Sequence, residues 1–170
     1  MPLQQWANFY VIVGSAAAAL TGLQFVVMAL SAQTTMARDA SAVDAFATPT
    51  IVHLGVVLTI SALMSVPRLT APIIATALAI VGAFGIVYSI VVVRRTKRQT
   101  GYTPVLEDWL WHIGFPFATY GALCVTGVIA VWHLDGALDV VSAIALALLF
   151  IGIHNAWDSA VYISTHPRRD

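Results

Sequence analysis

Five long runs of apolar residues alternate with shorter, more polar segments along the chain. The runs cover residues 8–30, 51–66, 72–93, 109–132 and 137–163. Each run is apolar on nearly all sides, which distinguishes an embedded helix from an amphipathic surface helix. Because a membrane-spanning helix needs about 20 predominantly apolar residues, the pattern predicts an all-α integral membrane bundle of five transmembrane helices. We expect one transmembrane domain that covers residues 1–170.

Residues that favour helix starts lie at the predicted boundaries. Pro49, Pro72 and Pro104 lie near the beginning of the second, third and fourth spans. A proline at the first helical position costs no hydrogen bond, because the N–H it lacks would have no partner there. The carboxylates of Glu107 and Asp108 suit the first turn of the fourth span, where the helix dipole is positive. The boundary chemistry therefore agrees with the apolar pattern.

The composition excludes several function classes. Hydrophobic residues make up 59% of the 170 residues and charged residues only 9%, whereas soluble domains carry about 25% charged residues. The mean hydropathy is +0.86. A chain of this composition is not expected to be a cytosolic enzyme, a disordered chain or a nucleic-acid binder. The lipid bilayer is its expected environment.

The basic residues predict an orientation. With five spans, seven of the eight Lys and Arg residues fall on one side and only Arg68 on the other. Those seven are Arg38, Arg94, Arg95, Lys97, Arg98, Arg168 and Arg169. Because basic loops stay in the cytoplasm, we expect a cytoplasmic C-terminus and an N-terminus outside. The first run has no basic segment before it and is too long for the apolar core of a signal peptide, so we expect it to be retained.

Small residues recur at every fourth position in the first and last spans. These rows are Gly14, Ala18 and Gly22, and Gly152, Ala156 and Ala160. In lipid, helices associate through close packing rather than through the hydrophobic effect, and small residues let two backbones approach. We expect both rows to be packing faces, within one protomer or between protomers. Pro116 is expected to kink the fourth span and to free carbonyls one turn earlier.

Three histidines fall inside the predicted spans, in the cytoplasmic leaflet. His53, His112 and His154 each lie roughly 4–10 Å inside the interface at 1.5 Å of rise per residue. His154 and Asp158 are four residues apart and therefore share a helix face, as do Asp108 and His112. Polar residues at membrane depth are candidates for function, because burying them in lipid is costly.

Imidazole and carboxylate groups at one depth predict a metal or proton site. The candidate metal ligands are His53, His112, His154 and Asp158, for a transition metal or a haem. The candidate supporting residues are Glu107, Asp108, Asn155 and Tyr162. A proton relay fits the same residues, because histidine titrates near neutrality. The structural interpretation stays open: each histidine can be a hydrogen-bonded core residue, and Glu107 and Asp108 can serve only the helix start.

Two residues exclude other chemistries. Cys124 is the only cysteine, so one chain cannot form a disulfide, a thiolate zinc site or an iron–sulfur cluster. Lys97 is the only lysine and lies in a predicted loop, which excludes a Schiff-base lysine inside the bundle.

Two segments carry a resemblance to a known group of proteins. The segment 9–26, FYVIVGSAAAALTGLQFV, resembles the first span of small uncharacterised bacterial polytopic integral-membrane proteins. The segment 152–158, GIHNAWD, is similar to the last span of the same group. The resemblance implies a multi-pass protein of the bacterial inner (plasma) membrane with a compact helical bundle. It implies no particular activity.

Three functions fit these observations. The first is a homo-oligomeric channel or transporter that moves an ion or a small solute, which suits the small size, the packing rows and the very short outer loops. The second is a membrane enzyme or redox protein that uses a metal or haem at the histidine cluster. The third is an accessory or scaffold subunit of a larger membrane complex. We expect the first, because it requires no convergence of particular side chains.

Overall fold

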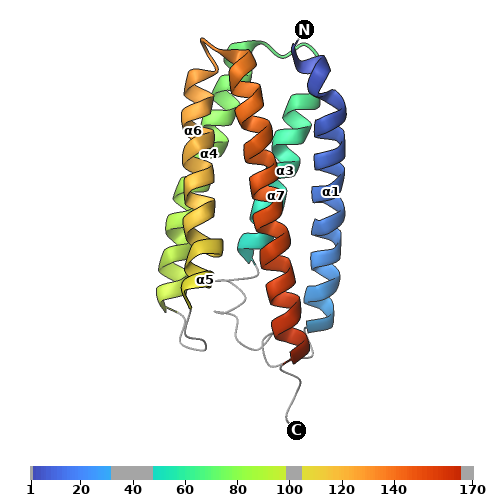
Figure 1. The fold of residues 1–170 in the computed structure, drawn as a ribbon, viewed down its shortest axis with the longest axis vertical. Coiled ribbons are helices and arrows are strands. Elements are labelled where there is room, and N and C mark those ends of the chain that lie inside the picture. Colours follow the sequence, from blue (N-terminus) through green and yellow to red (C-terminus); the bar gives the residue numbers. More distant parts are fainter. Residues whose placement is uncertain (1, 32–47, 99–104, 166–170) are drawn as a thin grey trace.

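The computed structural model of the chain describes residues 2–31, 48–98 and 105–165. The described chain consists of helices joined by short turns. In order they are α1 (Pro2–Ser31), α3 (Thr48–Ser65), α4 (Ala71–Arg98), α5 (Leu106–Trp109), a π-helical turn η3 (Leu110–Gly114), α6 (Phe115–Ile129) and α7 (Leu134–Thr165). α5, η3 and α6 follow one another without a break and form one continuous helical segment (Figure 1).

Five stretches of the described chain are long and apolar enough to span a membrane. They are Gln5–Ala29, Thr48–Ser65, Ala71–Arg98, Leu106–Ile129 and Leu134–Val161. The prediction of an all-α bundle with five spans is therefore confirmed. The fourth span ends at Ile129, three residues before the predicted end, because residues 130–132 form the turn into α7. α4 continues to Arg98, since the hydrogen bonds of a helix do not require apolar side chains.

The helices form two pairs with α7 between them. α1 packs mainly on α3, and α4 packs mainly on α6, while α7 contacts α3, α6 and α1. The chain begins at one end of the bundle and its last helix ends at the other (Figure 1). We call the end that contains the N-terminus the upper end. α3 is shorter than its neighbours and begins well above the lower ends of α1 and α7 (Figure 1).

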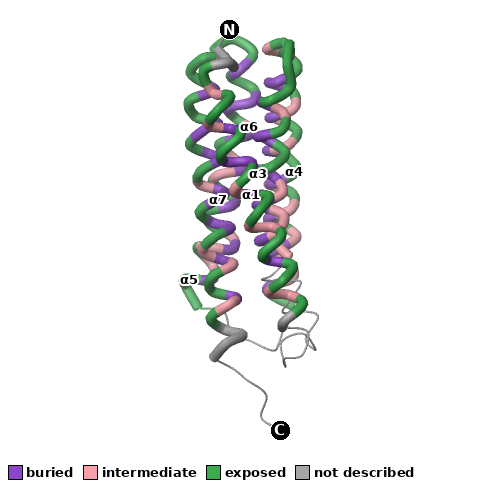
Figure 2. The backbone as a smooth tube through the Cα atoms, turned by 90° about the vertical axis from the view of Figure 1, so that its right-hand side faces the viewer, coloured by how far each residue is buried: buried purple, intermediate pink, exposed green. Residues whose placement is uncertain are grey.

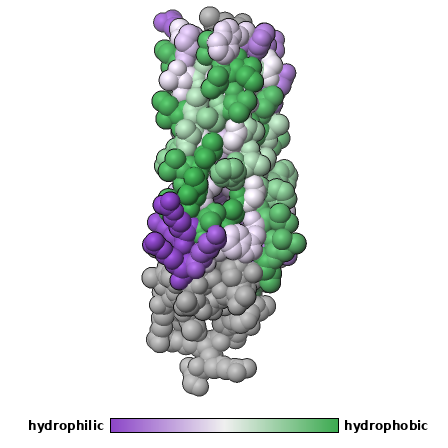
Figure 3. Space-filling view, turned by 90° about the vertical axis from the view of Figure 1, so that its left-hand side faces the viewer, coloured by the Kyte–Doolittle hydropathy of each residue, from purple (hydrophilic) through white to green (hydrophobic). Residues whose placement is uncertain are grey.

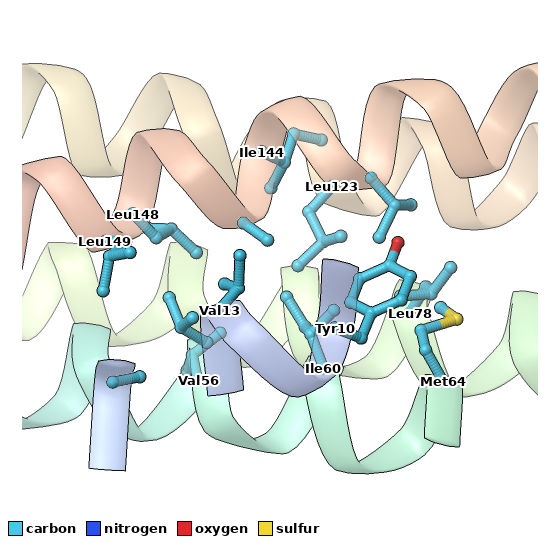
Figure 4. Close-up of a cluster of buried hydrophobic side chains, with 14 of the residues drawn as sticks. Tyr10, Val13, Val56, Ile60, Met64, Leu78, Leu123, Ile144, Leu148 and Leu149 are labelled. Atoms are coloured by element: carbon cyan, nitrogen blue, oxygen red, sulfur yellow. The ribbon is translucent and has the colours of Figure 1, made fainter. Parts of the chain in front are cut away.

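An apolar core fills the upper part of the bundle. Tyr10, Ile60, Met64, Leu78 and Leu123 gather there from four helices (Figure 4). Each is at most 3% exposed. Along the helices, buried residues face the interior and exposed residues face outward (Figure 2). These side chains make the interior of the upper half predominantly apolar.

The predicted rows of small residues pack within the chain only in part. A Cβ atom on Gly14 would lie 2.8 Å from the Ser61 Cβ atom, and one on Gly152 would lie 2.7 Å from Leu54, so both glycines pack against α3. In contrast, Ala18 and Gly22 are exposed, and nothing lies within 4 Å of a Cβ built on Gly22. Ala156 and Ala160 are half-buried.

The closest helix contact is between α4 and α6, which the sequence patterns did not single out. A side chain at Gly82 would overlap the Cys124 backbone, and one at Gly127 would overlap the Ala79 backbone. A side chain at Gly85 would overlap the ring of Tyr120. We call these contacts the α4–α6 seam. Gly82 and Gly85 lie on α4 and Gly127 on α6, so the spacing within one span does not reveal the seam.

Candidate functional site

The fourth span contains an irregular turn beside its proline. Leu110–Gly114 form a π turn, and the Phe115 N–H donates to the Leu110 carbonyl five residues back. Pro116 follows and has no N–H. The Trp111 carbonyl therefore lacks a helical donor, since Phe115 is already used and Pro116 cannot donate. The predicted freeing of carbonyls before Pro116 thus takes the form of a π turn, a feature frequent at functional sites.

Asn155 of α7 donates to this carbonyl. Its side-chain amide nitrogen lies 3.4 Å from the Trp111 carbonyl oxygen, and Asn155 is fully buried. At this distance the hydrogen bond is weak, but it gives a buried carbonyl a partner that its own helix cannot supply. The contact joins α7 to η3.

His154 lies against the same turn. Its ring stacks on the Trp111 indole, with ring centres 3.8 Å apart and ring planes 7° from parallel. His154 Nε2 lies 3.5 Å from Glu107 Oε1, and the Glu107 side chain is 69% exposed. Its Nδ1 atom lies 3.4 Å from the Asn155 side-chain oxygen. His154 is thus held by contacts with residues of α5, η3 and its own helix.

Asp108 has a structural role at the start of α5. The Val105 backbone N–H donates to Asp108 Oδ2 at 2.8 Å, so the carboxylate caps a helix end whose amides otherwise lack partners. Asp108 is 8% exposed. Asp108 also lines a pocket together with the buried ring of His112. The helix-start interpretation of Asp108 therefore holds, and the residue also belongs to the polar surroundings of His112.

These side chains surround a pocket at the lower end of the bundle. Its volume is about 220 Å³. The lining residues are Val105, Glu107, Asp108, Trp111, His112, His154 and Asp158. With neutral histidines, the three carboxylates give the lining a negative charge. A concave site with this lining favours a cation.

His53 lies apart from this pocket. It is 1% exposed, and its Nδ1 atom lies 2.8 Å from the hydroxyl oxygen of Tyr120, which is fully buried. The two ring centres are 5.6 Å apart. α3, on which His53 lies, begins well above the lower ends of α1 and α7 (Figure 1).

The structure therefore brings together most, but not all, of the predicted site. His112, His154, Asp158, Glu107 and Asp108 share one pocket, and Asn155 supports its wall. His53 is paired with Tyr120 instead. Within the described ranges, no three His, Cys, Asp or Glu side chains are placed to hold one metal ion. The Tyr162 side chain lies outside the part that the structure describes.

Tyr120 and Trp111 are the site residues that sequence reasoning missed. Both lie in an apolar run, where an aromatic residue is ordinarily a core residue. Tyr120 follows Pro116 by four residues, and this spacing does not predict which residue its hydroxyl contacts. The only available signal was its phenol group, since a buried Tyr hydroxyl usually finds a hydrogen-bond partner.

The surface around the lower end is strongly charged. On the face that carries α4 and α6, hydrophilic side chains gather at the lower part, and most of the remaining described surface is hydrophobic (Figure 3). α4 ends there with Arg95, Lys97 and Arg98 in its last turn. Comparison with known protein families, with curated proteins and with solved structures gives no match for this chain. The geometry is therefore the basis for the functional argument.

Proposed function

We propose that the protein moves a small cation across a membrane and that the lower pocket is the mouth of the route. The observation that carries this proposal is the pocket itself, in which Glu107, Asp108 and Asp158 lie beside two imidazoles at one end of a membrane bundle. Rings of carboxylates favour cations in membrane pores. A volume of about 220 Å³ holds several waters at about 30 Å³ each. A hydrated ion or a small organic cation therefore fits.

The upper half of the bundle supports a homo-oligomer as the working unit. Apolar side chains fill that half of the protomer, so a polar route must be completed elsewhere. Small bundles can build a pathway between protomers. The exposed small residues Ala18 and Gly22 of α1 leave room for the close approach of a second copy.

We infer that the pocket faces the cytoplasm. Among the described basic residues, Arg94, Arg95, Lys97 and Arg98 lie at the lower end and Arg68 at the upper turn. The positive-inside rule then places the lower end, with the C-terminus, in the cytoplasm. Arg38, Arg168 and Arg169 lie outside the described residues. The resemblance of two segments to bacterial membrane proteins supports an inner-membrane location.

The other two functions have less support. A metal or haem site has one observation in its favour, since His112, His154 and Asp158 line one pocket. However, in the described part of the chain these groups do not converge on one ion position. The metal site stays a prediction, and so does the role of an accessory subunit.

Currents from proteoliposomes test the proposed function. Purified protein is adsorbed on a solid-supported membrane and exposed to concentration jumps of Na⁺, K⁺, methylammonium or guanidinium, and to pH jumps. We expect a transient current with at least one of these cations. Asp158→Asn should reduce it at least about tenfold, because a charge-assisted contact contributes roughly 1.5–3 kcal/mol and 1.4 kcal/mol corresponds to a factor of ten.

Asp139→Asn is the matched control. Asp139 is also an exposed carboxylate on α7 but lies near the upper end, away from the pocket. We expect its currents to equal those of the wild type. If every cation and the pH jump give no current, the proposed function is wrong. Equal losses in the two variants would show that α7 charges act only on stability or insertion.

A further inference from the structure

The imidazole of His53 has one nitrogen in use and one without a partner. Nδ1 is paired with the Tyr120 hydroxyl at 2.8 Å. Nε2 is buried and has no hydrogen-bond partner among the described residues. A buried polar nitrogen in an apolar surrounding is costly unless it is hydrogen-bonded. This nitrogen therefore indicates a hydrogen-bonding ligand.

Counting donors and acceptors within the His53–Tyr120 pair favours one tautomer of His53. If Tyr120 donates to Nδ1, the proton of the ring is on Nε2, and that N–H is the one group left without a partner. If Nδ1–H donates to Tyr120, two groups lack partners: the tyrosine O–H and the bare Nε2 atom. The first arrangement leaves fewer unpaired groups. In that arrangement Nε2–H is a buried donor that requires an oxygen acceptor.

His53 does not line the pocket, whereas His112 does. Both rings are at most 3% exposed. Thr50, three residues before His53 on α3, is also fully buried.

We propose that His53 Nε2–H binds a neutral oxygen ligand, a water molecule in the resting protein, at a buried position inside the bundle. Tyr120 is the positioning residue, because its hydroxyl holds the ring in the tautomer that places the proton on Nε2. A role of this water in cation movement rests on the proposed function. Water binding at His53 does not, and it can be measured without any flux.

Magic-angle-spinning NMR of the ¹⁵N-labelled full chain in liposomes tests the inference. The His53 signals are identified by their loss in His53→Gln. We expect a neutral ring with its proton on Nε2 and transfer of magnetisation from water to that proton. The exposed ring of His133 serves as the water-contacting control, and the backbone amide of fully buried Val57 serves as the dry control. A ring with its proton on Nδ1, or an Nε2 proton without transfer from water, overturns the proposal.

Tyr120→Phe separates positioning from simple burial. Without the hydroxyl, we expect His53 to show two tautomers instead of one, while the backbone signals of the helices stay in place. Tyr10→Phe is the matched variant, because Tyr10 is equally buried and has no hydrogen-bond partner among the described residues; it should leave the His53 signals unchanged. A single unchanged tautomer in Tyr120→Phe would exclude the positioning role. Absent currents with intact water contact would overturn only the proposed function.

Discussion

The α4–α6 seam and the pocket end of the same bundle are built in opposite ways. At the seam, Gly82 and Gly127 let two regular helices approach until their backbones touch. At the pocket end, η3 departs from regular helix geometry, and Asn155 reaches across to a carbonyl that Pro116 leaves without a donor. One region has little polar chemistry and tight packing, whereas the other has many polar groups and open space.

The difference indicates how this small protein separates stability from its candidate site. In lipid, no hydrophobic effect drives helices together, so close contact at the seam is a main source of association. The pocket end cannot pack as tightly, because polar side chains need partners and the pocket needs volume. Most of the stability of the fold therefore has to come from the seam and the apolar core, because the pocket region contributes little.

The largest expected effect comes from filling the seam. Gly127→Leu should destabilise the protein by about 3 kcal/mol or more, since the new side chain meets the Ala79 backbone, which cannot move aside as a flexible side chain could. Gly22→Leu should be nearly neutral, because its surroundings are open within the protomer. Thermal unfolding in detergent measures both variants.

Gly22→Leu also tests the oligomer. If α1 contacts a second copy through Ala18 and Gly22, the variant should change the mass measured by light scattering while the protomer stays folded. If Gly127→Leu unfolded at the wild-type temperature, the seam would not be the stabilising region described above.

A smaller effect is expected from the buried hydroxyls. Tyr120→Phe removes a hydrogen bond to His53 and should cost about 1 kcal/mol, within the range found for such bonds in membrane proteins. Tyr10→Phe removes a buried hydroxyl without a partner among the described residues and should be neutral or stabilising. Chemical unfolding in mixed micelles compares the pair. Equal costs for the two variants would mean that the His53–Tyr120 bond contributes nothing specific.

The smallest effect concerns the irregular turn. Asn155→Leu should cost about 0.6 kcal/mol, since the bond to Trp111 is long. Pro116→Ala returns an N–H that can donate to the Trp111 carbonyl. In the Pro116→Ala background, Asn155→Leu should therefore cost less stability. A double-mutant cycle measures this coupling. Additive costs would show that Asn155 does not act through the carbonyl that Pro116 leaves free.

The candidate site was partly predictable from the chain. His154 and Asp158 lie on one helix at a spacing that determines their shared face, so their joint presence at the pocket followed from the sequence. His112 and Asp108 are related in the same way. His53 was expected in the same layer, but depth along a membrane does not determine helix rotation. α3 turns His53 toward Tyr120, which no spacing within one span could indicate.

The sequence alone determined the number of spans, their approximate bounds and the all-α class, because long, predominantly apolar runs have few alternatives to a membrane helix. Only the tertiary structure decided which helices pair and that three glycines form the α4–α6 seam. It also decided that His53 bonds to Tyr120 and does not line the pocket. These outcomes depend on how each helix rotates about its axis. Rotation is determined by contacts between distant residues, and a pattern within one span does not contain that information.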